Sequence, residues 1–243
     1  MERNYRIADT VFSVRSLYER VHDYCKDYVT DEPAEIDIAI TEEDIAYERS
    51  RSARTAEASG YAMSEKRSEY LEELAVYRKM AAALLDRDIL LFHGSAVAVD
   101  GETYLFTAKS GTGKSTHTRL WREYFGERAV MVNDDKPLIY LPENGTPVIY
   151  GTPYNGKHRL GSNMSAPLKA VCILTRSENN HIEKISRSEA YALLLQQTNR
   201  PVEPSAMQKT MTLVDRLADS TALYRLGCNM DISAAEVAYN GMK

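Results

Sequence analysis

The run Ala-Lys-Ser-Gly-Thr-Gly-Lys-Ser-Thr at residues 108–116 constrains the fold of this chain more than any other stretch. An apolar run at 104–107 precedes it and is expected to be a buried strand, and the apolar spacing over 118–125 is typical of a helix. A strand, a glycine-rich loop and a helix, in this order, form the context that a phosphate-binding loop requires. The alternative is a glycine- and serine-rich loop that follows a strand by chance.

The residue types of this loop suit a nucleotide. Gly111 and Gly113 lack a Cβ, so backbone N–H groups can approach phosphate oxygens, and the following helix adds its unpaired N–H groups. Lys114 can reach the β- and γ-phosphates, and Ser115 can offer its hydroxyl to a bridging Mg²⁺. Ala108 replaces the first glycine of the usual pattern. The predicted cofactors are therefore ATP and Mg²⁺, and the predicted nucleotide-binding residues are Ser110, Gly111, Thr112, Gly113, Lys114, Ser115 and Thr116.

Composition excludes several classes of partner. The formal net charge of the 243 residues is −5 and no basic stripe is evident, so neither DNA nor RNA is expected as a partner. The three cysteines, Cys25, Cys172 and Cys228, are far apart and indicate neither a zinc site nor a disulfide framework. No apolar run is long enough to cross a bilayer, and residues 1–6 begin no signal region. The protein is expected to be soluble and cytoplasmic, without a membrane partner.

The chain is expected to divide into a small N-terminal α+β region, residues 1–64, and a core, residues 65–243. Residues 5–14 have the composition of strands, and residues 35–40 alternate with the period of a strand that has one solvated face. The N-terminal region carries no catalytic constellation and is interpreted as a structural or oligomerisation layer, which leaves a homo-oligomer open. Residues 69–86 show the clearest amphipathic helix, which is expected to pack on the core sheet.

The core is predicted to begin with the apolar run 89–99, the hairpin signal Asp100-Gly101 and the strand 102–107. The phosphate loop therefore follows a β-hairpin. Further strands are expected at 129–132, 138–141, 148–150, 168–174, 181–185 and 221–226, and further helices at 187–197, from 204 onward and at 233–239.

Two acidic residues, Asp134 and Asp135, follow the predicted strand 129–132. Beside a phosphate loop, one carboxylate can hold Mg²⁺ and the other can accept a proton from an attacking hydroxyl. The alternative is a turn that only ends the strand. In the long loop predicted at 151–163, Lys157, His158 and Arg159 can neutralise a transferring phosphoryl group or hold the acceptor, unless they are ordinary solvated charges.

Three motifs in order carry a family resemblance: His-Gly-Ser-Ala at 93–96, Ser-Gly-Thr-Gly-Lys-Ser-Thr at 110–116 and Asn-Asp-Asp at 133–135. Together they resemble the HPr serine kinase/phosphorylase and phosphoenolpyruvate carboxykinase superfamily. The resemblance implies an α/β (α+β) fold: a P-loop kinase core with a mixed, partly antiparallel sheet.

By the same resemblance, Asp134 is the general base and His93 lies beside it and tunes it, whereas Asp135 and Ser115 hold Mg²⁺. Asp134, His93 and Lys114 are the implied catalytic residues. A histidine satisfied within the core is the alternative for His93. HPr kinases carry a Glu-x-Arg-Gly-Leu-Gly loop, of which this chain matches only Arg-Leu-Gly at 159–161, without the acid.

The function predicted from these residues is ATP- and Mg²⁺-dependent transfer of phosphate to a hydroxyl, with a peptide, small protein or small molecule as acceptor and a serine as the favoured group. A nucleotide-binding regulatory module with little or no catalysis stays open. Carboxykinase chemistry is a third reading, although a carboxykinase is about twice as long and has oxaloacetate-binding segments that this chain does not match.

Overall fold

A computed structural model describes residues 1–58, 66–156 and 158–243 of the chain. The chain divides into two compact units, Met1–Ala83 and Leu84–Lys243. The sequence placed this division at 64/65 instead. The difference is almost entirely one helix, α3, which the structure assigns to the N-terminal unit up to Ala83.

The N-terminal unit is an α+β unit with the strand order β1-β2-β3, in which β1 and β2 are antiparallel and β2 and β3 are parallel. Residues 5–14 form a hairpin, because Ala8 and Asp9 both have positive φ and make a two-residue turn that suits the twist of the strands. The elements are β1 (Glu2–Ile7), β2 (Thr10–Arg15), α1 (Arg20–Tyr24), the 3-10 turn η1 (Lys26–Tyr28), β3 (Ile36–Ala39), α2 (Glu42–Ala58) and α3 (Ser68–Leu85).

Helix α3 is held in the N-terminal unit by charged side chains. The carboxylate of Glu72 accepts hydrogen bonds from the backbone N–H groups of Leu17 and Tyr18, and Lys79 pairs with Asp44 of α2. The structure therefore assigns this helix, up to Ala83, to the N-terminal unit, whereas the sequence placed it in the core at 65–243. Its apolar stripe was visible in the sequence, but the partners of its polar residues were not.

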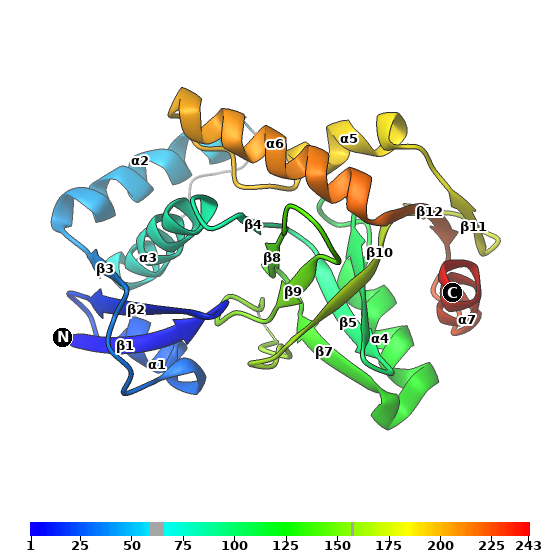
Figure 1. Ribbon diagram of the computed structural model, residues 1–243, viewed down its shortest axis with the longest axis horizontal. Helices are drawn as coiled ribbons and strands as arrows, with labels where there is room; N and C mark the ends of the chain where they lie inside the picture. The colour runs from blue at the N-terminus through cyan, green and yellow to red at the C-terminus, as the bar shows by residue number, and fades with distance from the viewer. Residues whose placement is uncertain (59–65, 157) are drawn as a thin grey trace. The chain divides into compact units, whose positions relative to one another are not determined.

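The C-terminal unit is built on a sheet of nine strands among the described residues, with the order β4-β8-β9-β10-β6-β5-β7, β12 beside β10 and β11 beside β12 (Figure 1). Its elements are β4 (Ile89–Leu91), β5 (Ser95–Val99), β6 (Glu102–Thr107), α4 (Lys114–Phe125), the 3-10 turn η2 (Gly126–Arg128), β7 (Ala129–Asn133), β8 (Leu138–Tyr140), β9 (Val148–Tyr150), β10 (Ser165–Arg176), β11 (His181–Lys184), α5 (Arg187–Gln196), α6 (Pro204–Ser220), β12 (Ala222–Cys228) and α7 (Ser233–Met242).

The predicted hairpin before the loop is confirmed. Asp100 and Gly101 both have positive φ and join the antiparallel strands β5 and β6. The apolar run 89–99 is interrupted between β4 and β5. Gly94 lies in this gap, and a Cβ there would lie 2.8 Å from the Leu105 side chain and 3.0 Å from the Phe106 carbonyl oxygen, so the position requires glycine.

The sheet is mixed, as expected. Strand β5 is antiparallel to β6 and β7, whereas β10 is parallel to β6 and β12 is parallel to β10. Strands β6, β7, β10 and β12 therefore end at one edge of the sheet. In α/β folds, this is the edge where ligands bind.

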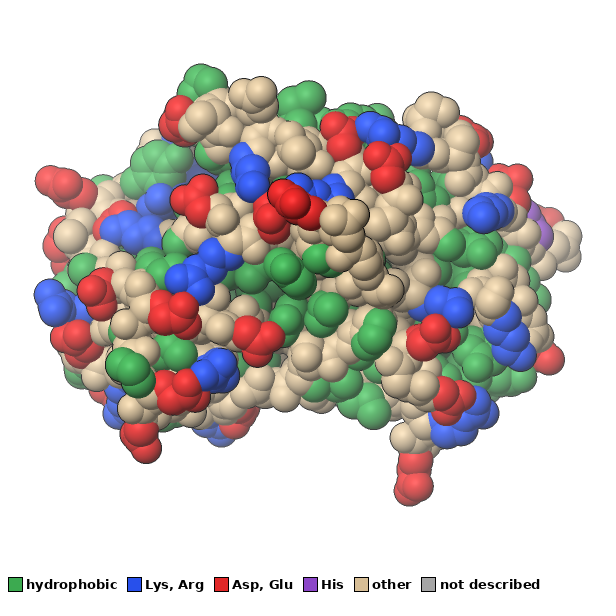
Figure 2. All heavy atoms as spheres, viewed as in Figure 1, with side chains coloured by type: hydrophobic (Ala, Val, Ile, Leu, Met, Phe, Trp, Pro, Cys, Tyr) green, Lys and Arg blue, Asp and Glu red, His purple; other side chains and the backbone are tan. Residues whose placement is uncertain are grey.

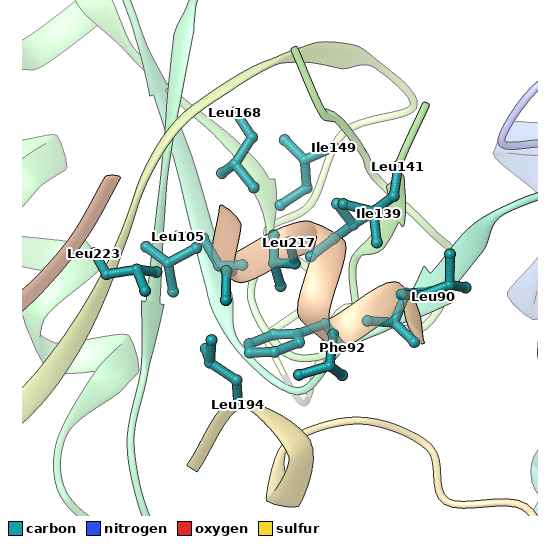
Figure 3. Close-up of a cluster of buried hydrophobic side chains, with 14 of the residues drawn as sticks. Leu90, Phe92, Leu105, Ile139, Leu141, Ile149, Leu168, Leu194, Leu217 and Leu223 are labelled. Carbon is teal, nitrogen blue, oxygen red and sulfur yellow. The ribbon is translucent and has the colours of Figure 1, made fainter. Parts of the chain in front are cut away.

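Helices cover both faces of this sheet (Figure 1). Helices α5 and α6 bury one apolar cluster, in which Phe92, Leu105 and Leu217 point toward one another (Figure 3). Helices α4 and α7 bury the other, where Trp121 of α4 and Tyr239 of α7 meet edge to face. Alternate residues of β6 enter the two clusters, as the pleat of a strand requires.

No helix in the part of the chain that the structure describes is long and apolar enough to cross a membrane. Acidic and basic side chains are interspersed on the face shown in Figure 2.

Candidate functional site

The loop 108–113 joins β6 to α4, so the predicted order of strand, loop and helix is observed. Gly111 and Gly113 have φ of 78° and 122°, backbone conformations that residues other than glycine rarely adopt. A Cβ added to Gly111 would meet no heavy atom within 4 Å, so there is open space beside the loop. Gly113 lies directly before α4, where the unpaired N–H groups of that helix begin.

Two sets of hydrogen bonds hold the loop, one within it and one from β10. Thr112 donates from its backbone N–H and from its hydroxyl to the carbonyl of Lys109. Arg176, the last residue of β10, donates from Nη2 to the carbonyl of Gly111 at 2.7 Å. Arg176 is not among the site residues predicted from the sequence. The available signal was its place at the end of a strand that runs parallel to β6.

Lys114 and Ser115 form the first turn of α4, and Thr116 follows them. The Lys114 ammonium is half-buried and donates to the carbonyl of Ala108 at 3.4 Å. Burial lowers the pKa of Lys114, while the negative charges of Asp135 and Asp134 act in the opposite direction. The structure therefore brings the loop lysine close to the predicted acidic pair.

Asp134 follows the end of β7 and is 7% exposed. The hydroxyl of Ser95, the first residue of β5, donates to its Oδ1 at 2.9 Å, and the Ser115 side chain hydrogen-bonds to the same carboxyl group. Burial raises the pKa of Asp134, and the charge of Asp135 raises it further, against the effect of the two serines.

Asp135 is less buried and is paired with His93. His93 Nε2 lies 3.3 Å from Asp135 Oδ1, and Lys136 Nζ lies 3.8 Å from Asp135 Oδ2. Burial alone would raise the pKa of Asp135, but the His93 hydrogen bond and the charges of Lys136 and Lys114 outweigh it, so the pKa is lowered.

Neighbouring carboxyl groups with pKa values pushed in opposite directions suit different chemical roles. Asp134 has the stronger tendency to take up a proton, and Asp135 has the stronger tendency to stay ionised. His93 contacts Asp135, whereas the sequence placed it beside Asp134.

Asn133, which has no role among the residues predicted from the sequence, holds the acidic pair in place. Its Oδ1 accepts hydrogen bonds from the backbone N–H groups of Asp135 and Lys136, and its Nδ2 donates to Thr152 Oγ1. The Asn-Asp-Asp turn therefore ends strand β7, as in the alternative interpretation of a turn that only ends the strand. It also fixes the backbone that carries the two carboxylates.

The predicted long loop is observed over the described residues 151–156 and 158–163. Gly156 packs on the acidic pair, since a Cβ there would lie 3.5 Å from Asp135 Cβ. His158 is exposed and close enough for its charge to lower the pKa of Asp134. Arg159 is exposed and lies in the turn that follows Gly156. Lys157, the third predicted substrate residue, lies outside the described residues.

The side chains at this edge fit a magnesium nucleotide. No group of three or more His, Cys, Asp and Glu side chains within 1–58, 66–156 and 158–243 could hold a metal ion by itself. The donors present are the Ser115 hydroxyl and two carboxylates, which are the oxygen ligands that Mg²⁺ shares with phosphates. A magnesium ion here would therefore depend on phosphate oxygens for further ligands.

Comparisons with known proteins identify a family and a similarity to solved structures. The family described as "SynChlorMet cassette protein ScmC" matches residues 62–230, well over half of the chain. No curated protein matches the sequence.

Among solved structures, the chain is similar to one titled "Structure of the Hpr(Ser) kinase/phosphatase from Coxiella burnetii". The identity is 11% and the TM-score 0.32, over 62% of this chain and 94% of that chain. At this TM-score, the likeness assigns no role to any residue.

Proposed function

The chain belongs to the ScmC family, and we propose that it is an ATP- and Mg²⁺-dependent kinase that transfers phosphate to a hydroxyl. One observation carries the proposal: the first turn of α4, with Lys114 and Ser115, faces the carboxylates of Asp134 and Asp135. A phosphate-binding helix terminus opposite an acidic pair is the arrangement that phosphoryl transfer uses.

The loop residues bind and orient the nucleotide. Backbone N–H groups within residues 110–116, other than that of Thr112, which donates to the carbonyl of Lys109, bind phosphate oxygens, and the dipole of α4 favours their negative charge. Lys114 neutralises the β- and γ-phosphates. Its pKa is lowered by burial, so its positive charge is less well solvated and gains from contact with an anion.

Ser115 and Asp135 would hold Mg²⁺. The ion supplies charge neutralisation between the β- and γ-phosphates when it is bound. The lowered pKa of Asp135 keeps its carboxylate ionised for this task, and His93 fixes the orientation of that carboxylate.

Asp134 takes the proton from the attacking hydroxyl of the acceptor. Its raised pKa makes it a stronger base than an exposed aspartate, and the Ser95 hydroxyl orients the carboxylate through Oδ1. His158, with Arg159 and Lys157 in the same segment, holds the acceptor or the transferring group. The acceptor class we propose is a serine of a peptide or small protein, as the motif resemblance suggests.

The test is transfer of labelled phosphate from Mg²⁺-ATP to an extract of peptides and small molecules. Asp134→Asn removes the base but keeps the shape of the side chain, and Lys114→Ala removes the phosphate ligand. Asp100→Asn, in the exposed β5–β6 turn, and Lys169→Ala, a partly exposed residue of β10, are the matched controls.

We expect transfer by the wild type and both controls, a loss of about 10²- to 10⁴-fold in Asp134→Asn, and loss of ATP binding in Lys114→Ala. Retained ATP binding by Asp134→Asn separates base removal from unfolding. If the wild type binds ATP but transfers phosphate to nothing, the proposal is wrong and the chain is a nucleotide-binding module. Mass spectrometry of the labelled component identifies the acceptor.

A further inference from the structure

Two apolar side chains are exposed in the short segment between β12 and α7. Met230 is 79% exposed and Ile232 is 45% exposed. Residues 229–232 follow the carboxyl end of β12, so these side chains lie at the same sheet edge as the phosphate loop. An apolar side chain displayed at a ligand-binding edge is a candidate for contact with the ligand.

The segment that displays them is held in a defined conformation. Asn229 donates from Nδ2 to the carbonyl of Glu178, and its backbone N–H donates to Asn180 Oδ1, both on the β10–β11 turn. Asp231 accepts a hydrogen bond from the backbone N–H of Ser233, where α7 begins. Met230 and Ile232 are therefore presented on a braced platform, which we define as residues 229–232.

This platform flanks the phosphate loop. Strand β10 lies between β6 and β12, and its last residue, Arg176, bonds to the loop carbonyl of Gly111. On the α4 side of the sheet, α4 and α7 pack together through Trp121, Phe125 and Tyr239. The loop that precedes α4 and the platform that precedes α7 are thus separated by the width of one strand.

The acidic pair sets the direction of a bound nucleotide. Lys114, Ser115 and Asp134 mark the end of the triphosphate that reacts, and Asp134 follows β7, on the β5 side of β6. The α-phosphate and the nucleoside must then extend to the other side of the loop, over β10 and β12.

We propose, on the basis of the proposed function, that the platform with Met230 and Ile232 is the subsite for the base of the nucleoside triphosphate. The contact is apolar, against the flat face of the base. Two side-chain oxygens of the platform are already engaged: Asn229 Oδ1 accepts from the N–H of Asp231, and Asp231 Oδ1 accepts from the N–H of Ser233. A contact through Met230 and Ile232 selects a planar base and discriminates little between adenine and guanine.

The experiment compares binding of Mg²⁺-ATP, Mg²⁺-GTP and Mg²⁺-tripolyphosphate by calorimetry. The test variant is the double change Met230→Ala with Ile232→Ala. The matched control is Met211→Ala on α6, because Met211 is also an exposed methionine, at 41%, on a helix that packs on the face of the sheet opposite α7. Tripolyphosphate carries the phosphates without a base, so it separates the two subsites.

We expect the double variant to bind ATP and GTP about tenfold more weakly, from loss of apolar contact, and to bind tripolyphosphate as the wild type does. Met211→Ala should leave all three affinities unchanged. Unchanged ATP binding in the double variant, or equal weakening of ATP and tripolyphosphate, overturns the subsite but leaves the proposed function standing. If the wild type binds neither ATP nor tripolyphosphate, both proposals are wrong.

Discussion

Replacing Ser95 by alanine tests whether the buried hydrogen bond to Asp134 controls both stability and acid–base behaviour at this edge. The Ser95 hydroxyl is fully buried and donates to Asp134 Oδ1 at 2.9 Å and to the Asp134 carbonyl at 3.2 Å. Alanine removes the donor and leaves the rest of the side chain in place.

The expected loss depends on the charge of the acceptor. A hydrogen bond to an ionised group contributes about 1.5–3 kcal/mol, and one between neutral groups about 0.5–1.5 kcal/mol. Water cannot easily replace the hydroxyl, because Asp134 is buried. Ser95→Ala should therefore lower the free energy of unfolding of the C-terminal unit by about 1.5–3 kcal/mol at pH 7.

The sign of the pH dependence follows from the raised pKa of Asp134. The folded state favours protonated Asp134. The stability that this preference contributes is complete below the pKa of about 3.9 that an aspartate has in the unfolded chain, and it is lost as the pH rises through the pKa of Asp134 in the folded protein. Ser95 opposes this rise in pKa. Removal of the Ser95 hydroxyl should raise the pKa of Asp134 further. The loss of free energy of unfolding in Ser95→Ala should then be smaller at lower pH, and the acidic limb of the pH–rate profile of phosphoryl transfer should move to higher pH.

The only tryptophan of the chain, Trp121, is fully buried in the C-terminal unit, so its fluorescence reports urea unfolding of that unit. The control is Ser205→Ala, since the Ser205 hydroxyl also donates to a carboxylate, that of Glu203, but an exposed one. That change should have no measurable effect. A Ser95→Ala variant as stable as this control, or one whose acidic limb moves to lower pH, would contradict the reasoning.

Three further changes test the scaffold of the site. A Cβ on Gly151 would lie 1.8 Å from the carbonyl oxygen of Ser162. Gly151→Ala should therefore lower the free energy of unfolding of the C-terminal unit by about 3 kcal/mol or more, measured by the same fluorescence assay. A variant that unfolds at the same urea concentration as the wild type would contradict this prediction. Burial lowers the pKa of His117 to about 3. The stability that the neutral imidazole contributes is therefore complete above pH 6.5 and is lost as the pH falls toward 3. In urea titrations across this pH range, the free energy of unfolding of His117→Gln should fall less steeply than that of the wild type. Arg176→Ala frees the carbonyl of Gly111 and should weaken binding of Mg²⁺-tripolyphosphate by about two- to tenfold without changing urea unfolding; equal binding would show that the arginine does not support the loop.

Much of the local structure follows from short-range patterns. Asp100 and Gly101 favour positive φ and therefore a tight hairpin, and the glycines at 111 and 113 adopt the conformations that a strand-to-helix loop needs. These outcomes depend on a few neighbouring residues. The turn at Ala8 and Asp9 was missed because neither residue favours positive φ as strongly as Asn-Gly does.

The roles within the candidate site depend on contacts between distant residues, and these only the tertiary structure decided. Ser95 meets Asp134 across 39 positions and Arg176 meets Gly111 across 65. The sequence by itself determined that a glycine-rich loop, an acidic pair and a histidine lie at strand ends. The opposite pKa shifts of Asp134 and Asp135, and the contact of His93 with Asp135 rather than Asp134, arise from burial and from hydrogen bonds between strands. Desolvation and long-range pairing are properties of the packed sheet, so no local pattern of residues contains them.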